Sequence, residues 1–295
     1  MCFLFIHIVF VLNGLNDSLT NRQIYFGLTL TSYLFTVFVN LTLILTVCLD
    51  KTLHQPMYVF LCNLCFTGIC GASSFYLKLL SDLLADAHVI TYTGCLTQML
   101  ISYTYIFCQL NSLTIMAYDR YLAICQPLRY WALMTVAVFI TTAWITAFLI
   151  VSCTTSLSFS LQLCGNVINK MYCDNYSIVK LACSDITVNN IYGLVSTALC
   201  VFGPLGIILY TYMRILQVCF SGSKQTRQKA VSTCTPHLAS LINFSFGICF
   251  EVLQSRFNMS TVPNVIRPLL NPVMYGLNLS KVQQAWKKLF SVQGR

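Results

Sequence analysis

An acidic and a basic residue stand next to each other at the end of a long apolar stretch, where isolated charges are costly. They are Asp119 and Arg120, and Tyr121 follows them. Removing either charge alone from water costs several kcal/mol by general estimates, so the two should pair or contact the interior of a helix bundle. One interpretation is an anchor at the membrane interface. The other is a switch, in which local acids hold Arg120 in one state and release it to a partner in another.

Other residue types that carry chemistry do not form a catalytic set. No Ser/His/Asp set, metal cluster or phosphate-binding loop converges on one place in the sequence. Cys62 and Cys65 have the spacing of a redox or metal motif, but they lie inside an apolar stretch, where cysteine behaves as a small hydrophobe. A histidine in an apolar stretch, such as His237, is more often a core residue with its hydrogen bonds satisfied than a metal ligand. The sequence therefore predicts no enzyme, no metal site and no cofactor.

The composition points to a chain that crosses a membrane several times. Of its 295 residues, 57% are hydrophobic and only 8% are charged, which is too apolar for a water-soluble surface. The net charge of +9 has no long basic run behind it, so nucleic acid is not the expected partner. The positions of the basic residues instead indicate how the spans are oriented in the membrane.

Six apolar stretches are long enough to cross a bilayer, which takes about 17–25 residues. They are residues 26–49, 57–80, 95–124, 133–159, 190–220 and 230–253, with a seventh, shorter candidate at 263–279. The predicted fold is an all-α membrane protein, a seven-transmembrane-helix bundle with a shortened seventh helix. We expect an extracellular N-terminus at 1–25, the seven-helix domain at 26–280, and a cytoplasmic tail at 281–295 with a short amphipathic helix on the membrane lipids.

The loop charges predict the orientation, because Lys and Arg beside membrane spans are retained on the cytoplasmic side. With the N-terminus outside and seven spans, the inner side carries the whole +9 charge and the outer side nets zero. This orientation exposes a glycosylation sequon at Asn16 to the lumen. A second sequon at Asn175 lies beside Cys173, which we expect to hold it close to the bundle.

Four of the sixteen cysteines lie in or beside polar outer loops: Cys95, Cys164, Cys173 and Cys183. An even number can pair in an oxidising compartment, but four positions allow three pairings, and spacing alone does not choose among them. Residues 1–12 are apolar yet lack Lys or Arg before the hydrophobic stretch, which argues against a cleaved signal peptide. A tail lying on the membrane, or a wrongly assigned start codon, is the expectation there.

Five motifs spread over the chain resemble those of odorant receptors in the rhodopsin-like class of G-protein-coupled receptors. The most specific is MAYDRYLAIC at 116–125. The others are LHQPMY at 53–58, TYMRI at 211–215, KAVSTCTPHL at 229–238 and PLLNPVMY at 268–275, with Asn40 at the family's polar position in span one. Asp185 after Ala182-Cys183-Ser184, and Gly276-Leu277 after the last motif, resemble the fish-type branch of the family.

The resemblance implies a role for several residues at the inner ends of the spans. Tyr212 and Tyr275 would approach Arg120 in the active state. The implied switch and G-protein-coupling set is Asp119, Arg120, Tyr121, Tyr212, His237, Asn271, Pro272 and Tyr275. Pro204 and Pro272 interrupt helices, as structural kinks or as hinges.

The resemblance also implies the outer arrangement. It pairs Cys95 with Cys173 and Cys164 with Cys183, which would fold the long outer loop over the bundle mouth. A small-molecule odorant would bind beneath that loop. By helical position its candidate contacts are Ser102, Tyr103, Ile106, Ser196, Cys200, Ile248 and Val252, with ordinary helix packing as the alternative for each. The partner would be a heterotrimeric G protein of the stimulatory, olfactory type, and the location the plasma membrane of sensory cilia.

The chain departs from the family pattern at three places. Gly68 stands where most of the wider superfamily has an Asp, which puts a sodium-linked site in doubt. The middle of span six, residues 243–247, lacks the aromatic-and-proline toggle. The seventh candidate has 17 residues, roughly 25 Å of helix against a hydrocarbon core of about 30 Å, and it contains Arg267.

Two alternatives to a working receptor remain open from the sequence. One is the non-signalling product of a decayed or misassembled receptor gene, motivated by the short seventh span. The other, less favoured, is a transporter or channel. That class usually shows charges near the midplane and interrupted spans from inverted repeats, and the sequence shows neither.

Overall fold

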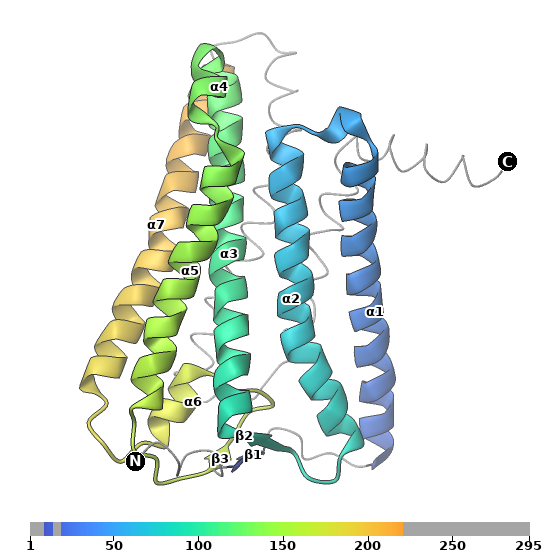
Figure 1. Cartoon of the computed structure of the whole chain (residues 1–295), viewed down its shortest axis with the longest axis vertical. Coiled ribbons are helices and arrows are strands. Elements are labelled where there is room, and N and C mark those ends of the chain that lie inside the picture. Colours follow the sequence, from blue (N-terminus) through green and yellow to red (C-terminus); the bar gives the residue numbers. More distant parts are fainter. Residues whose placement is uncertain (1–8, 14–18, 221–295) are drawn as a thin grey trace, which may run out of the picture.

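The computed structural model describes residues 9–13 and 19–220. Five long helices run side by side along one axis, as Figure 1 shows: α1 (Leu19–Leu49), α2 (Pro56–Leu84), α3 (Tyr92–Cys125), α5 (Val136–Phe159) and α7 (Thr187–Phe220). They correspond to the first five predicted spans. The sixth and seventh candidates, at 230–253 and 263–279, lie outside the described residues.

Short elements close the two ends of these helices. At one end lie the strands β1 (Val9–Leu12), β2 (Val89–Thr91) and β3 (Val167–Ile168) and the helix α6 (Asn175–Lys180), and we call this the sheet end. At the opposite end lie the 3₁₀ turns η2 (Lys51–Leu53) and η3 (Pro127–Arg129) and the helix α4 (Tyr130–Leu133), and we call this the α4 end.

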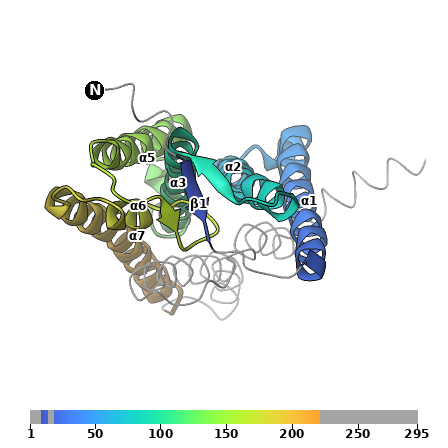
Figure 2. The ribbon, with the colours of Figure 1, turned by 90° about the horizontal axis from the view of Figure 1, so that it is seen from below.

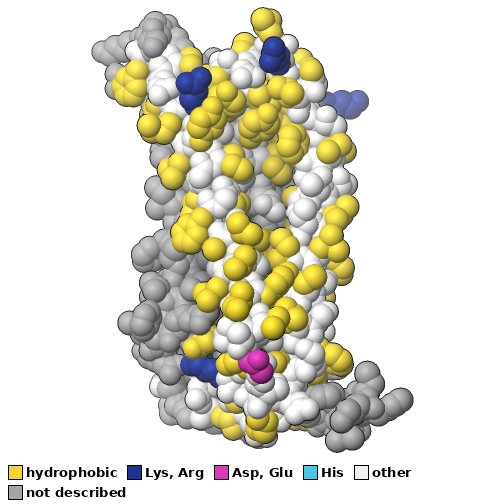
Figure 3. All heavy atoms as spheres, turned by 90° about the vertical axis from the view of Figure 1, so that its left-hand side faces the viewer, with side chains coloured by type: hydrophobic (Ala, Val, Ile, Leu, Met, Phe, Trp, Pro, Cys, Tyr) yellow, Lys and Arg dark blue, Asp and Glu magenta, His cyan; other side chains and the backbone are white. Residues whose placement is uncertain are grey.

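The outward faces of the helices are apolar along their length. Phe38, Leu149 and Phe202, on three different helices, each expose more than half of their surface. On the face drawn in Figure 3, hydrophobic side chains are spread between the two ends and charged side chains lie only toward the ends. Among the described residues, α1, α2, α5 and α7 are long and apolar enough to cross a membrane. Such a surface suits a lipid environment.

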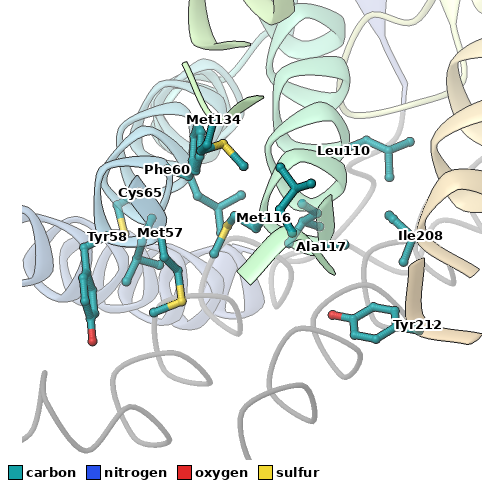
Figure 4. Packing of buried hydrophobic residues seen from close by; sticks show 14 of the residues in the cluster. Met57, Tyr58, Phe60, Cys65, Leu110, Met116, Ala117, Met134, Ile208 and Tyr212 are labelled. Atoms are coloured by element: carbon teal, nitrogen blue, oxygen red, sulfur yellow. The ribbon is translucent and has the colours of Figure 1, made fainter. Parts of the chain in front are cut away.

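Helix α3 is the least apolar of the long helices, and it lies in the centre of the described bundle. It packs against α2, α5 and α7. Its buried positions include the polar residues Gln98, Gln109, Ser112 and Asp119. A large apolar cluster surrounds the half of α3 nearer the α4 end, with Met116 and Ala117 facing Phe60 of α2 and Ile208 of α7 (Figure 4).

The buried polar side chains of α3 bond to neighbouring helices. Gln109 donates to the carbonyl of Leu64 at 2.8 Å and to the hydroxyl of Thr67 at 3.1 Å. Asn63 donates to Ser112 at 2.8 Å and accepts from the indole of Trp144 at 2.9 Å. Hydrogen bonds of this kind join helices in an environment without water, at about 0.6 kcal/mol each on average.

Gly68, the position that departs from the superfamily pattern, lies beside this polar network. A Cβ added there would stand 3.4 Å from both the Asn40 Oδ1 and the Gln109 Nε2 atoms. The neighbours of Gly68 are therefore neutral amide groups on α1 and α3.

The sheet is the main element that sequence analysis did not anticipate. Strand β1 lies between β2, which it pairs in antiparallel fashion, and β3, which it pairs in parallel fashion. The N-terminal segment was expected to lie on the membrane, but residues 9–12 form the central strand of a sheet across the bundle end. The reason is that segments far away in the sequence supply hydrogen-bond partners for the backbone of this strand.

Helix α1 starts at Leu19, seven residues before the predicted span, because its first turn forms hydrogen bonds with α2. Arg22 donates from Nη2 to the carbonyl of Leu83 at 3.2 Å and to that of Ala85, both at the end of α2. A guanidinium there supplies donors to carbonyls that have no partner within their own helix. The contact ties the sheet ends of α1 and α2 together.

The close approach of α2 and α3 depends on Gly71. A Cβ at this position would lie 2.3 Å from Cγ of the Tyr105 ring, far inside contact distance. Small residues at helix interfaces permit such packing in membrane proteins.

We predict that Gly71→Ala lowers the free energy of unfolding by about 1–3 kcal/mol, the usual cost of overpacking. The measurement is thermal unfolding of the detergent-purified protein. Gly27→Ala is the matched control, because a Cβ at Gly27 would meet no atom within 4 Å. Equal melting temperatures for the two variants would contradict the prediction.

Candidate functional site

The acid–base pair lies at the α4 end of α3, and its carboxylate is completely enclosed. Asp119 is 0% exposed, and its Oδ2 lies 2.8 Å from Nη2 of Arg120. Its other oxygen, Oδ1, accepts a hydrogen bond of 2.6 Å from the hydroxyl of Tyr130 on α4. Both carboxylate oxygens are thus engaged, one by a charge and one by a neutral donor. In this conformation Arg120 is held by an acid of its own helix.

Tyr130 is suited to donate a hydrogen bond to Asp119 by its protonation state as well as its position. Burial first, and then the hydrogen bond to Asp119, raise the pKa of Tyr130 above its ordinary value. The hydroxyl therefore stays protonated at neutral pH and remains a donor. Tyr130 occurs where α3 has ended and the chain has turned through η3, so the contact spans 11 residues of sequence.

Further aromatic side chains lie at the same end of the bundle. The hydroxyl of Tyr121 accepts from Gln126 Nε2 at 3.1 Å, and its ring lies 6.4 Å from that of Tyr210 on α7. Tyr212 is 8% exposed and belongs to the central apolar cluster. In Figure 4 its hydroxyl points from α7 toward the centre of the bundle. Of the predicted switch residues, Asp119, Arg120, Tyr121 and Tyr212 thus lie at one end of the bundle. The remaining four, His237, Asn271, Pro272 and Tyr275, lie outside the described residues.

The surface beside this cluster is apolar and open. Leu128 is 101% exposed and Trp131 is 80% exposed. They flank Arg129 and Tyr130 in the turn between α3 and α5. A fully exposed leucine next to basic residues is suited to contact with another protein.

Two of the candidate ligand contacts on α3, Ser102 and Tyr103, lie toward the sheet end. We call the strands at that end, α6 and the loop between α5 and α7 the cap. Ser102 shares a hydrogen bond of 3.1 Å with Ser74 of α2. The hydroxyl of Tyr103 accepts from the backbone N–H of Asn175 at 3.0 Å. Ile106, one turn further along, packs against the central apolar cluster instead.

The candidates on α7 have other surroundings. Ser196 donates to the carbonyl of Gly193 within its own helix at 3.3 Å, and Cys200 is half-buried. Ile248 and Val252 lie outside the described residues. The structure thus links Tyr103 to the cap and Ser102 to α2, while Ile106 packs against the central apolar cluster.

Two disulfide bonds hold the cap, and they join the pairs that the resemblance implies. Cys95 of α3 is bonded to Cys173, with their Cα atoms 5.4 Å apart. Cys164 is bonded to Cys183, with their Cα atoms 5.8 Å apart. The first bond fastens the long loop to α3, and the second closes the loop on itself.

Sequence analysis missed Gln98 and named Asn175 only as a sequon held close to the bundle, although both residues hold the cap in place. Gln98 accepts from the backbone N–H of Cys173 at 3.0 Å and donates to the carbonyl of Ser74 at 3.2 Å. Asn175 accepts from Ser158 at 2.5 Å, so the side chain of the second sequon is engaged in the bundle. Gln98 precedes Ser102 by four residues and therefore shares its helix face, a spacing that sequence analysis did not use.

Comparison with known proteins agrees with this arrangement. The sequence profile of the family described as Olfactory receptor matches residues 29–293. Human olfactory receptor 1F1 is 36% identical over 95% of this chain and 94% of its own length. Human olfactory receptor 7A10 is 35% identical over 95% of both chains, and mouse olfactory receptor 8U3 is 34% identical over 95% of this chain and 92% of its own.

These matches cover nearly the whole chain, including the two predicted spans that the structure does not describe. Members of this family are multi-pass plasma-membrane receptors that bind odorants and couple to G proteins, and they are not enzymes. The described helices supply five of the seven spans, with the motif around Arg120 at the expected helix end. The chain belongs to the olfactory receptor family and is a seven-helix, odorant-binding G-protein-coupled receptor.

Proposed function

We propose that this receptor has its N-terminus outside the cell, binds its odorant beneath the cap at the sheet end, and signals through Arg120 at the α4 end. The observation that carries the proposal is the enclosed contact of Asp119 with both Arg120 and Tyr130. It holds Arg120 away from a partner in the resting state. An odorant that favours a second arrangement of the bundle would release it.

Charge distribution supports the orientation. Among the described residues, the α4 end carries Lys51, Arg120, Arg129 and Arg214 against only Asp50 and Asp119. The basic and acidic residues described at the sheet end balance each other: Arg22, Lys78, Lys170 and Lys180 against Asp82, Asp86, Asp174 and Asp185. An excess of basic residues is typical of the cytoplasmic side.

The same orientation suits the chemistry of each end. Both disulfide bonds would face the oxidising exterior. The exposed Leu128 and Trp131 would face the cytosol, where a G protein of the stimulatory, olfactory type is the proposed partner. The proposed location is the membrane of sensory cilia, with the tail at 281–295 lying on the inner lipid leaflet.

The odorant site is proposed among the candidates on three helices. Ser102, Tyr103, Ile106, Ser196 and Cys200 are the described members, and Ile248 and Val252 complete the set. Ser102 and Tyr103 carry hydroxyl groups and Ile106 is apolar, a combination that suits a small ligand with few polar atoms.

We predict that Arg120→Ala abolishes the odorant-evoked cAMP response while the protein still reaches the cell surface. Arg120 lies at the opposite end from the proposed pocket, so binding should be retained. Lys51→Ala is the matched control, because Lys51 is an exposed basic residue at the same end of the bundle, in the turn between α1 and α2. A normal response from Arg120→Ala at equal surface expression would remove Arg120 from the mechanism.

We predict that Asn16 carries the glycan that an outside N-terminus requires. Asn16→Gln should abolish most of the mass shift on glycosidase treatment. Ser177→Ala, which removes the second sequon but keeps Asn175, should leave the shift intact, since Asn175 is bonded to Ser158. Detection of an N-terminal tag on the cytosolic face of the membrane would contradict the predicted topology.

We predict that the short seventh span impairs this chain. Arg267 would stand inside the hydrocarbon layer, where an unpaired Arg costs about 2.5–3.5 kcal/mol on insertion scales, unless Glu251 pairs with it. Inserting a typical seventh-span segment after Arg267 should raise surface expression and odorant response. The same segment appended after Arg295 is the control. If the lengthened and original chains behave alike, the short span is tolerated.

A further inference from the structure

Strand β1 has two different faces. Val9 and Val11 are about 40% exposed, whereas Phe10 is 0% and Leu12 is 2% exposed. All four residues are apolar, so burial alone distinguishes the two sides of the strand. The inner side carries the largest apolar side chain of the strand into the molecule.

The strand is bonded on both edges. Leu12 donates its backbone N–H to the carbonyl of His88 at 2.8 Å. Val11 and Asn13 donate to the carbonyls of Asn166 and Ile168 on the other side, also at 2.8 Å. A strand held on both edges is a fixed part of the cap. Seen from the sheet end, β1 crosses over the end of α3 (Figure 2).

Phe10 and Leu12 belong to the apolar cluster that covers the sheet end of α3. The ring of Phe10 lies 5.9 Å from that of Tyr92, and the same cluster contains Met99 and the bonded pair Cys95 and Cys173. Tyr103 packs against this cluster. Met99 precedes Ser102 and Tyr103 by three and four residues, which is one helical turn. The candidate ligand contacts on α3 therefore begin one turn beneath the layer that Phe10 helps to form.

We propose that the N-terminal strand is the outer wall of the odorant site, in which Phe10 and Leu12 seal the extracellular mouth above Ser102 and Tyr103. This inference rests on the proposed location of the odorant site. It assigns to residues 9–12 a part in selecting ligands, because an odorant must fit beneath side chains that the N-terminal segment supplies. The remaining walls come from the helices and from the disulfide-bonded loop.

The seal can be tested without a known odorant. The test measures how fast a water-soluble reagent reacts with a cysteine placed at the site. Ser102→Cys is treated on intact cells with a small, negatively charged methanethiosulfonate that does not cross membranes. The rate of modification is measured above that of the same protein with Ser102 intact, which corrects for native cysteines. Each variant is compared at equal surface expression, with the Cys95–Cys173 bond verified by peptide mapping.

Modification of Ser102→Cys should be slow with β1 intact and several-fold faster when Phe10→Ala is added. Val11→Ala on the exposed face of the strand is the matched control and should stay slow. Phe10→Leu, which keeps an apolar side chain, should give a smaller acceleration and serves if the alanine variant does not reach the surface. Rapid modification with β1 intact, or equal rates for Phe10→Ala, Phe10→Leu and Val11→Ala, would overturn the proposal. The odorant response and its dependence on Arg120 are read separately, so the seal can fail while the proposed function stands.

Discussion

The absence of water in the membrane interior is the constraint on which the rest of this structure depends. Backbone groups there must bond within their own helix, and buried polar side chains must find partners in neighbouring helices. Helix α3 carries many such side chains, and it lies where α2, α5 and α7 surround it. Its central position follows from its polarity, because a helix with Gln109, Ser112 and Asp119 on its surface is poorly suited to lipid.

The same helix holds different chemistry at its two ends. At the sheet end, Cys95, Gln98 and Tyr103 bond to the loop that forms the cap. At the other end, Asp119 is closed in by Arg120 and Tyr130. The proposed odorant contacts and the proposed G-protein contact thus lie on one helix. We propose that a change in how α3 packs at one end reaches the other.

Hydropathy predicted the positions of the five long helices but not all of their ends. Residues 57–80 fell inside α2, and 190–220 ended at the same residue as α7. Helix α1 began earlier than predicted because Arg22 finds carbonyl partners on α2. The predicted fourth span started at 133, whereas η3 and α4 interrupt the chain and α5 begins at Val136. Such ends are set by tertiary contacts, which no local pattern records.

The functional residues divide in the same way. Asp119 and Arg120 could be found from the sequence, because adjacent charges beside an apolar stretch require an explanation. Tyr130 could not, since its role depends on how the turn after α3 folds back. Strand β1 was also missed: a run of four apolar residues has no alternation that shows a strand with one buried face. Its partners are loops that follow it by about 80 and 155 residues.

The central claim is that the hydrogen bond from Tyr130 to Asp119 helps to hold Arg120 in the resting state. Tyr130→Phe tests it most directly, because the ring and its packing remain while the hydroxyl is lost. The measurement is ligand-independent cAMP at matched surface expression, made in the original chain and in the chain with the lengthened seventh span. A rise in this basal signal that disappears when Arg120→Ala is added is the predicted result. A basal signal equal to that of the parent protein in both chains would contradict the claim.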